Sequence, residues 1–222
     1  MARWAPLRTD VLDEYSGEVL QIFPRGRLLV GVDGLDGAGK TTFAADLVDA
    51  LQRREVDAAT VSLDDFHTAR EVRHAAPDDG ATWYRQAYDV EAFRRLVVQP
   101  YRKGEPVTLQ YRDAETDAVS TDPPMWTPSE RAVLVVEGLY LHRPELVGLW
   151  HTTAWLETDV ETGIARCEAR DADKPSWRPD VPERIRQAAE RYFREVDPRK
   201  RAVASFDMHD SAHPRRIFSD SC

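Results

Sequence analysis

Residues 34–41 (GLDGAGKT) match the phosphate-binding pattern G-x-x-x-x-G-K-[ST] in full. Glycines allow the backbone to turn tightly, so that its N–H groups can lie against phosphate oxygens. A helix that begins at the end of this turn adds unpaired N–H groups and the positive end of its dipole. The pattern therefore predicts a loop that binds a nucleoside triphosphate. The alternative is a glycine-rich turn that only joins a strand to a helix.

Two residues of this loop are predicted to act through their side chains. We expect Lys40 to reach the β- and γ-phosphates as a point charge, and the Thr41 hydroxyl to bind Mg²⁺. The predicted cofactors are thus ATP and Mg²⁺. The residues of the loop that we expect to contact the nucleotide are Gly34, Asp36, Gly37, Ala38, Gly39, Lys40, Thr41 and Thr42.

A pair of acids, Asp64 and Asp65, follows the second predicted strand, residues 57–62. The carboxyl ends of neighbouring parallel strands open into one crevice, so a carboxylate there can face the γ-phosphate. Phosphoryl transfer to an alcohol needs a group that accepts the hydroxyl proton and positions the oxygen. We predict that Asp64 is this base, with Asp65 as the second choice. A helix N-cap or a solvated loop aspartate is the alternative.

Another acid, Glu137, follows the apolar run at residues 132–136 (AVLVV). An acid at the end of a buried strand is suited to hold Mg²⁺ directly or through water. The sequence therefore predicts Thr41, Asp64 and Glu137 as metal-associated residues. The alternative for Glu137 is an acid that only faces solvent.

Basic residues gather in the last third of the chain. Arg166 and Arg170 are four residues apart on a predicted helix, and the polar segment that follows contains Lys174 and Arg178. Cations on a movable segment can close over ATP and exclude water. We therefore predict a lid at about residues 171–181, with Arg166 in contact with the nucleotide.

The next predicted helix carries Arg184, Arg191 and Arg194 on one face. These side chains could also serve a lid. For any one of them, a solvated helix face is an equally good reading of the pattern.

The histidines and aromatic residues give weaker signals. His67, His74 and His142 lack the spacing of metal ligands, so we interpret them as loop residues, although His67 could contact substrate. Trp83 and Tyr88 precede a predicted helix, where they could line a pocket for a base or a sugar. Packing in the core is equally consistent with their positions.

The order of the predicted elements indicates one α/β domain over residues 1–222. Short apolar runs typical of buried parallel strands alternate with segments of helical spacing, which predicts a three-layer α/β/α P-loop NTPase fold with a central, mostly parallel sheet and a small lid. The predicted strands are residues 27–33, 57–62, 132–136, 152–156 and 205–208, and the predicted helices are residues 11–23, 41–54, 90–98, 160–170 and 182–196. Residues 64–82 and 113–130 are predicted to be irregular, and residues 105–112 to form one arm of a hairpin.

The composition limits the class of partner. The formal net charge of -9 argues against nucleic-acid binding by a basic surface. No apolar run approaches the roughly 20 residues that span a bilayer, and the presence of 2 cysteines suits a reducing compartment. We therefore expect a cytoplasmic protein with a small-molecule substrate, without nucleic-acid or membrane partners. The sequence leaves open whether the protein forms a homo-oligomer.

Five segments in order, GLDGAGKTT, SLDDFH, AYDVEAF, VVEGLYL and ARCEARD, resemble the uridine kinase and phosphoribulokinase branch of P-loop kinases. The tail ASFDMHDSAHPRRI is similar to the closing strand of that family. The resemblance implies an ATP-dependent kinase that phosphorylates a hydroxyl of a small metabolite, with the 5′-hydroxyl of uridine or cytidine as the first candidate. Related kinases of pantothenate, glycerate, nicotinamide riboside or sugar phosphates share much of this pattern. A P-loop NTPase with water as acceptor is a further alternative.

The resemblance also implies roles for single residues. Asp64 matches the catalytic aspartate of the family, and Arg170 matches a catalytic arginine of its lid helix. Asp89 matches an acid that grips ribose hydroxyls, and Tyr111 an aromatic residue beside the base. The residues that we expect to bind the acceptor are Asp65, His67, Tyr88, Asp89 and Tyr111.

The sequence departs from the family pattern at the substrate and lid segments. TLQYRD stands where uridine kinases carry a PVYDF-like motif, and Cys167 occupies the position of a second lid arginine. These segments bear on the identity of the acceptor, whereas the phosphate loop and the predicted base are complete.

Overall fold

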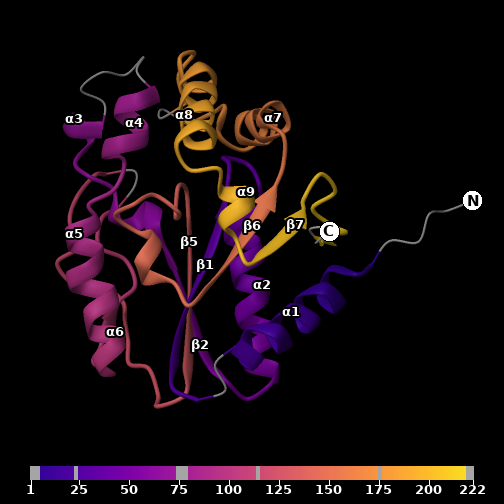
Figure 1. Cartoon of the computed structure of the whole chain (residues 1–222). Helices are drawn as coiled ribbons and strands as arrows, with labels where there is room; N and C mark the ends of the chain where they lie inside the picture. The colour runs from indigo at the N-terminus through magenta and orange to yellow at the C-terminus, as the bar shows by residue number, and fades with distance from the viewer. Residues whose placement is uncertain (1–5, 23–24, 74–79, 114–115, 175–176, 219–222) are drawn as a thin grey trace, which may run out of the picture.

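A computed structural model describes residues 6–22, 25–73, 80–113, 116–174 and 177–218 (Figure 1). Its main sheet has six strands in the order β2-β5-β1-β6-β7-β8. The first five run parallel, and β8 pairs antiparallel with β7. The strands are β1 (Arg27–Gly34), β2 (Asp57–Ser62), β5 (Ala132–Gly138), β6 (Thr152–Glu157), β7 (Ala204–Asp207) and β8 (Arg215–Ile217). The predicted mostly parallel sheet is confirmed.

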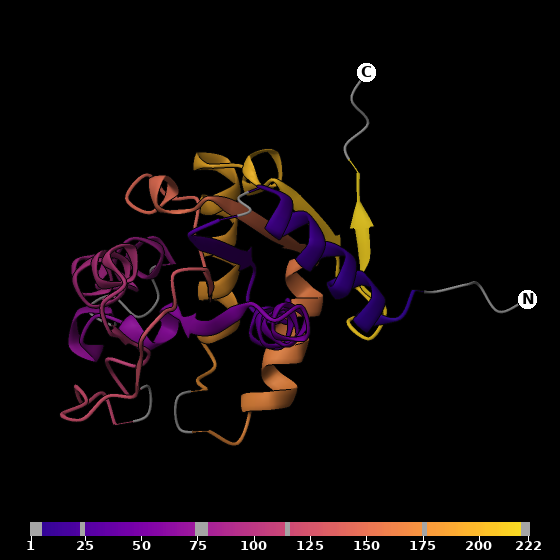
Figure 2. The same cartoon turned by 90° about the horizontal axis from the view of Figure 1, so that it is seen from below.

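Helices cover both faces of the sheet (Figure 2). On one face lie α1 (Arg8–Ile22) and α2 (Lys40–Arg53). The other face is covered by α4 (Gly80–Gln86), by a continuous helix made of α5 (Val90–Phe93), η2 (Arg94–Val98) and α6 (Gln99–Lys103), and by α8 (Val181–Glu195). α7 (Val160–Asp171) packs against α8 at the end of the sheet where the strands finish. The remaining short helices are η1 (Leu63–Phe66), α3 (Arg70–Arg73), η3 (Val147–Leu149) and α9 (Pro198–Arg201).

Strand β5 shows why this sequence forms a sheet with two covered faces. All seven of its residues are buried. Val133 and Val135 join the apolar cluster under α1 and α2, while Leu134 and Val136 join an aromatic-rich cluster on the opposite face. Because side chains alternate along a strand, a continuous apolar run fits a strand with helices on both sides. The three-layer α/β/α arrangement follows from this pattern.

The helix predicted for residues 90–98 continues to Lys103, so the predicted end before Pro100 is wrong. A proline has no N–H to donate and its ring crowds the carbonyl of the preceding turn. Here the backbone widens into a π-helical turn over Arg94–Val98 just before Pro100. Such a turn gives the ring room while the helix goes on.

The segment 64–82, predicted to be irregular, contains short helices in its described part. η1 includes both Asp64 and Asp65, α3 follows at Arg70–Arg73, and α4 begins at Gly80. These helices are too short to show an apolar repeat in the sequence. Residues 74–79, which include His74, lie outside the described residues.

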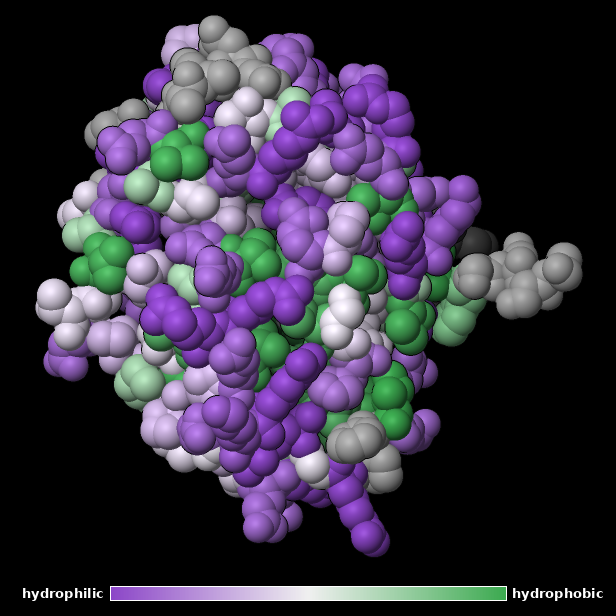
Figure 3. Space-filling view, turned by 60° about the vertical axis from the view of Figure 1, so that its left-hand side comes forward, coloured by the Kyte–Doolittle hydropathy of each residue, from purple (hydrophilic) through white to green (hydrophobic). Residues whose placement is uncertain are grey.

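The predicted hairpin arm is present as a short second sheet. β3 (Val107–Thr108) pairs antiparallel with β4 (Met125–Trp126). β4 lies inside residues 113–130, so the prediction that this whole segment is irregular is wrong at these two residues. In the described part of the chain no helix is both long and apolar enough to cross a membrane. On the face shown in Figure 3, hydrophobic residues mostly form small groups between hydrophilic ones.

Candidate functional site

The phosphate loop lies at the centre of the sheet, between the end of β1 and the start of α2. β1 has β5 and β6 as its two neighbours, so the loop stands over the crevice formed by the carboxyl ends of three strands. The backbone of Gly37 has φ +71 and that of Gly39 has φ +88, conformations that favour glycine. The loop therefore has the backbone shape and the helix N-terminus that anion binding requires.

Helix α7 touches this loop through backbone atoms. A Cβ added to Gly37 would lie 2.2 Å from the carbonyl oxygen of Gly163 in α7, and one added to Gly163 would lie 2.3 Å from the carbonyl oxygen of Asp36. Two glycines are thus required for the approach. The first turn of α7 supports the phosphate loop directly.

Lys40 and Thr41 make contacts inside the site. The Lys40 Nζ donates a hydrogen bond to the carbonyl oxygen of Leu35 at 2.9 Å, and the Thr41 hydroxyl donates to Glu137 Oε1 at 3.0 Å. Glu137 is buried at the end of β5, beside β1 and β2 in the sheet. Burial raises the pKa of Glu137, and the charge of Asp64 raises it further. A cation beside this carboxylate would oppose both effects, because it favours the charged form.

Asp64 and Asp65 have different surroundings although they are adjacent in η1. The side chain of Asp64 is 53% exposed and faces the main cleft of the molecule. The Tyr88 hydroxyl donates to Asp64 Oδ1 at 2.8 Å and itself accepts the Leu139 N–H at 3.3 Å. Tyr88 thereby fixes one oxygen of Asp64, and Oδ2 has no hydrogen-bond partner among the described residues. This geometry suits a carboxylate that accepts a proton from a molecule in the cleft.

Asp65 points toward the hairpin instead. Gln110 Nε2 donates to Asp65 Oδ1 at 3.3 Å, and the Asp65 backbone oxygen accepts the Arg112 N–H at 2.8 Å. Burial raises the pKa of Asp65 to about 6. Asp65 does not line the main cleft among the described residues, so the geometry favours Asp64 as the base.

The main cleft has a volume of about 1340 Å³ and joins the phosphate loop to α3, α4, α7 and α8. Of the predicted site residues, four line it: Asp36, Asp64, His67 and Arg170. Burial raises the pKa of Asp36, and the charge of Lys40 opposes this shift. Arg70, Arg73 and Asp117 also line the cleft, although no pattern in the sequence assigns them to the site.

Three of the residues predicted to bind the phosphoryl acceptor make contacts within the protein that define their positions. The Asp89 carboxylate accepts the Ala92 N–H at 2.9 Å as the N-cap of α5, and Tyr111 stacks on Phe66 with ring centroids 5.9 Å apart. Tyr88 is buried and stacks on His67 at 5.1 Å, so its hydroxyl reaches the site through Asp64. Substrate contacts of these three residues stay predictions.

The two arginines predicted for the lid helix differ in their contacts. The guanidinium of Arg166 donates to the carbonyl oxygens of Gly37 at 3.3 Å, Met208 at 3.1 Å and His209 at 2.9 Å. It therefore joins the phosphate loop to the end of β7. Arg170 is 65% exposed and pairs with Asp171 at the rim of the cleft. The described part of the predicted lid, residues 171–174 and 177–181, contributes to the cleft wall through Lys174 and Arg178.

Arg73 shows what the sequence could not reveal. It is buried and pairs with Asp117 at 2.9 Å, and it also donates to the Thr68 carbonyl. The two partners of the ion pair are 44 residues apart and meet only because the loop between β3 and β4 folds back. A single sequence carries no local pattern that marks such a pair.

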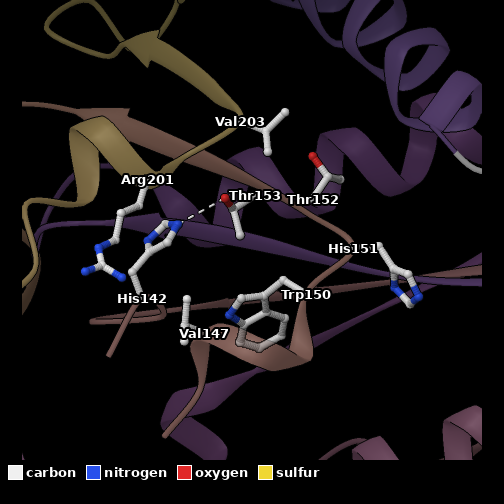
Figure 4. A pocket seen from close by; sticks show the side chains of 8 residues that line it. All are labelled: His142, Val147, Trp150, His151, Thr152, Thr153, Arg201 and Val203. Carbon is white, nitrogen blue, oxygen red and sulfur yellow. Dashed lines mark hydrogen bonds between the residues drawn. The ribbon is translucent and has the colours of Figure 1, made fainter. Parts of the chain in front are cut away.

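A buried polar network lies beneath the phosphate loop. Asp33 is fully buried, and its carboxylate accepts the Gly34 N–H at 2.8 Å, contacts His142 Nδ1 at 2.9 Å and accepts the Tyr192 hydroxyl. His142 Nε2 lies 3.0 Å from the Thr153 hydroxyl, beside a small cavity of about 280 Å³ (Figure 4). His142 is in a turn, as expected of a loop residue, but it is buried and fixes the first residue of the loop.

The donor set fits Mg²⁺ with a nucleotide. Mg²⁺ prefers oxygen ligands and is usually held by one or two carboxylates or hydroxyls, with phosphates and water completing the shell. The Thr41 hydroxyl and the Glu137 carboxylate provide such oxygens next to the phosphate loop. Among the described residues no group of three or more His, Cys, Asp or Glu side chains is arranged to hold a metal ion. The remaining ligands of a Mg²⁺ ion at these two residues would be phosphate oxygens and water.

A family model places this arrangement among known proteins. Residues 29–202 match the model described as "Phosphoribulokinase / Uridine kinase family". The chain belongs to this family. The match includes the phosphate loop, both acids after β2 and the lid helix, so the coarse activity is that of a P-loop kinase of small molecules.

Solved structures agree with this membership. A possible uridine kinase from Bacillus stearothermophilus is 26% identical, has a TM-score of 0.71, and is matched over 89% of this chain and 98% of its own. A protein from Silicibacter sp., provisionally assigned as a fructose transport system kinase, is 25% identical with a TM-score of 0.67, over 83% of this chain and 94% of its own. A D-glycerate 3-kinase from Cryptococcus neoformans shares the fold, with 13% identity and a TM-score of 0.60. The match covers 84% of this chain and 88% of the other.

Proposed function

We propose that this member of the family transfers the γ-phosphoryl group of ATP to a hydroxyl of a small metabolite. One observation carries the proposal: Asp36 of the phosphate loop and Asp64 line the same cleft. A triphosphate on the loop and a hydroxyl at Asp64 would therefore meet in one space. Such positioning, together with electrostatic stabilisation, provides most of the catalysis of phosphoryl transfer.

The chemistry assigns one task to each group. The acceptor oxygen attacks the γ-phosphorus, the bond from this phosphorus to the β-phosphate oxygen breaks, and the hydroxyl proton passes to Asp64 Oδ2. Tyr88 holds the other oxygen of Asp64 at 2.8 Å, so the carboxylate keeps its orientation. Lys40 exchanges its contact with the Leu35 carbonyl for the phosphates. Mg²⁺, held by Thr41 and Glu137, would neutralise charge on the phosphate oxygens.

The first acceptors to test are nucleosides, because the chain is similar to a possible uridine kinase. Trp83 and His67, whose ring centroids are 5.8 Å apart, provide flat surfaces at the cleft. Hydroxylated acids and sugar phosphates are the second group. They are favoured by the number of cations that line the same space, among them Arg73, Arg178 and Arg184.

A coupled assay of ADP release tests the proposal. The protein is supplied with ATP and Mg²⁺, with and without a panel of nucleosides, hydroxy acids, polyols and sugar phosphates. Release of ADP only in the presence of an acceptor supports the proposed kinase. Equal release in the absence of any acceptor means that water is the acceptor and contradicts it.

A further inference from the structure

The guanidinium of Arg184 is buried without enough partners. Its side chain is 8% exposed, and neither Nε nor Nη1 has a hydrogen-bond partner in the part of the chain that the structure describes. Buried polar groups are nearly always hydrogen bonded, because burial removes their hydrogen bonds to water and costs free energy unless protein or ligand atoms replace them. Arg184 nevertheless lines the main cleft. A buried cation with unpaired donors in the wall of a cleft indicates a place for a ligand with acceptor atoms.

The neighbours of Arg184 hold it in place without neutralising it. The nearest carboxylate, Asp180, lies 3.9 Å away and is engaged by Arg178 at 2.8 Å. The Arg184 guanidinium carbon lies 4.5 Å from the centroid of the Trp83 ring. Stacking on an aromatic face orients the plane of a guanidinium but leaves its N–H groups at the edge for an anion. A planar fork of this kind suits carboxylate and phosphate groups.

Arg184 reaches the cleft from a helix that is not part of the phosphate loop. It lies on α8, which packs closely on α4 at Gly80, where an added Cβ would be 2.9 Å from the Arg184 carbonyl oxygen. The Gly80 N–H also donates to Gln187 Oε1 at 3.0 Å. This contact fixes α8 to the helix that carries Trp83. The ATP phosphates have their own cation in Lys40.

The groups between Asp64 and Arg184 can bind hydroxyls. His67 Nε2 lies 3.7 Å from Asp64 Oδ1, and neither ring nitrogen of His67 is hydrogen bonded to a described residue. The His67 imidazole has two ring nitrogens that can take part in hydrogen bonds, and stacking on Tyr88 with ring centroids 5.1 Å apart holds the ring in place. The ring lies 5.8 Å from Trp83, on which Arg184 stacks. The cleft wall thus contains the proposed base, the His67 imidazole and a cation.

We infer that the phosphoryl acceptor is a hydroxylated anion whose carboxylate or phosphate group binds to Arg184, while its reacting hydroxyl lies at Asp64. This inference rests on the proposed function and narrows its substrate class. A neutral nucleoside would leave the Arg184 donors buried and unpaired, and sites built around a polar contact reject analogues that lack the matching group.

The test uses the full chain and two arginines of the same helix. Arg184→Gln removes the charge, and Arg186→Gln is the matched control, because Arg186 is exposed and pairs with Glu161 at 2.7 Å outside the cleft. In the ADP-release assay, anionic acceptors should give higher kcat/KM than neutral ones. Arg184→Gln should raise the acceptor KM by about 10- to 100-fold, which is the range for a hydrogen-bonded charge, with less than about a threefold change in the ATP KM. Arg186→Gln should behave like the wild type.

A binding measurement separates this inference from the proposed function. Calorimetry with the protein saturated with ADP and Mg²⁺ tests a hydroxycarboxylate and a sugar phosphate separately, which distinguishes the two sources of the anion. Binding to the wild type and its loss in Arg184→Gln support the inference even if no acceptor is phosphorylated. If Arg184→Gln does not fold, Arg184→Lys replaces it in the test. This variant keeps the charge and should bind the anion with intermediate affinity.

Three results would overturn the inference. In the first, a neutral nucleoside is the best acceptor and Arg184→Gln does not change its kcat/KM. In the second, neither anion binds the ADP-saturated protein. In the third, Arg184→Gln raises the KM of ATP instead of that of the acceptor, which would assign Arg184 to the nucleotide. The first of these results would leave the proposed kinase activity intact.

Discussion

The two halves of the cleft differ in how they are built and in how their cations are paired. The phosphate half is centred on one continuous segment, residues 34–41. Lys40 in this segment and Arg166 of the adjoining α7 already donate to backbone carbonyls. The acceptor half is assembled from η1, α3, α4 and α8, and its cation Arg184 has donors without a partner among the described residues. The phosphate half is thus held by backbone contacts, whereas the acceptor half depends on side chains that come from distant segments of the chain.

The largest effect should come from the base at the meeting point of the two halves. We expect Asp64→Asn to lower kcat by about 10²- to 10⁴-fold, the usual contribution of general-base catalysis, with the ATP KM changed only a few-fold. Steady-state kinetics with a saturating acceptor measures both constants. Asp65→Asn is the matched control, because Asp65 faces Gln110. If Asp65→Asn alone abolished activity, the assignment of the base would be wrong.

Lys40→Ala tests the phosphate half. Loss of a cation aimed at the transferred group should lower kcat/KM for ATP by about 10²- to 10³-fold. Arg53→Ala provides the control on the same helix, because Arg53 is exposed and pairs with Asp13 at 2.6 Å. Unchanged turnover in Lys40→Ala would remove the phosphate loop from the mechanism.

A smaller effect is expected where α7 supports the loop. In Gly163→Ala the new Cβ would lie 2.3 Å from the Asp36 carbonyl oxygen, so α7 or the loop must move. We expect kcat/KM for ATP to fall by roughly 10- to 100-fold, because displacement of a positioned group by a fraction of an ångström slows catalysis. Gly148→Ala, where an added Cβ meets no atom within 4 Å, should leave the kinetics unchanged. Equal kinetics of both variants would show that the loop does not depend on α7.

The smallest effect concerns the pH dependence of stability. Burial raises the pKa of Asp65 to about 6, whereas an unfolded aspartate titrates near 4. Between these values the folded state binds more protons than the unfolded state, so this residue makes stability fall as the pH rises from about 4 to about 6. Asp65→Asn should therefore gain stability relative to the wild type between pH 4.5 and pH 7. Urea unfolding at both pH values measures this difference, and an identical pH response of the two proteins would contradict it.

The sequence was a good guide to the phosphate half and a poor one to the acceptor half. The apolar run of β5 and the 34–41 pattern are local, so they predict the sheet and the loop directly. The contacts of Arg73 with Asp117 and of Arg184 with Trp83 join residues far apart in the chain. The first contact forms because the loop between β3 and β4 folds back on α3, and the second because α8 packs on α4, and no local pattern encodes either. Pro100 was misread because a π-helical turn upstream accommodates it.

The fate of the γ-phosphoryl group tests the central claim most directly. ATP labelled at the γ-phosphate is incubated with the protein, Mg²⁺ and the best acceptor of the panel, and the products are separated. We predict that the label appears on the acceptor hydroxyl and that Asp64→Asn slows its appearance. Label that appears as inorganic phosphate at the same rate with and without acceptor would contradict the account.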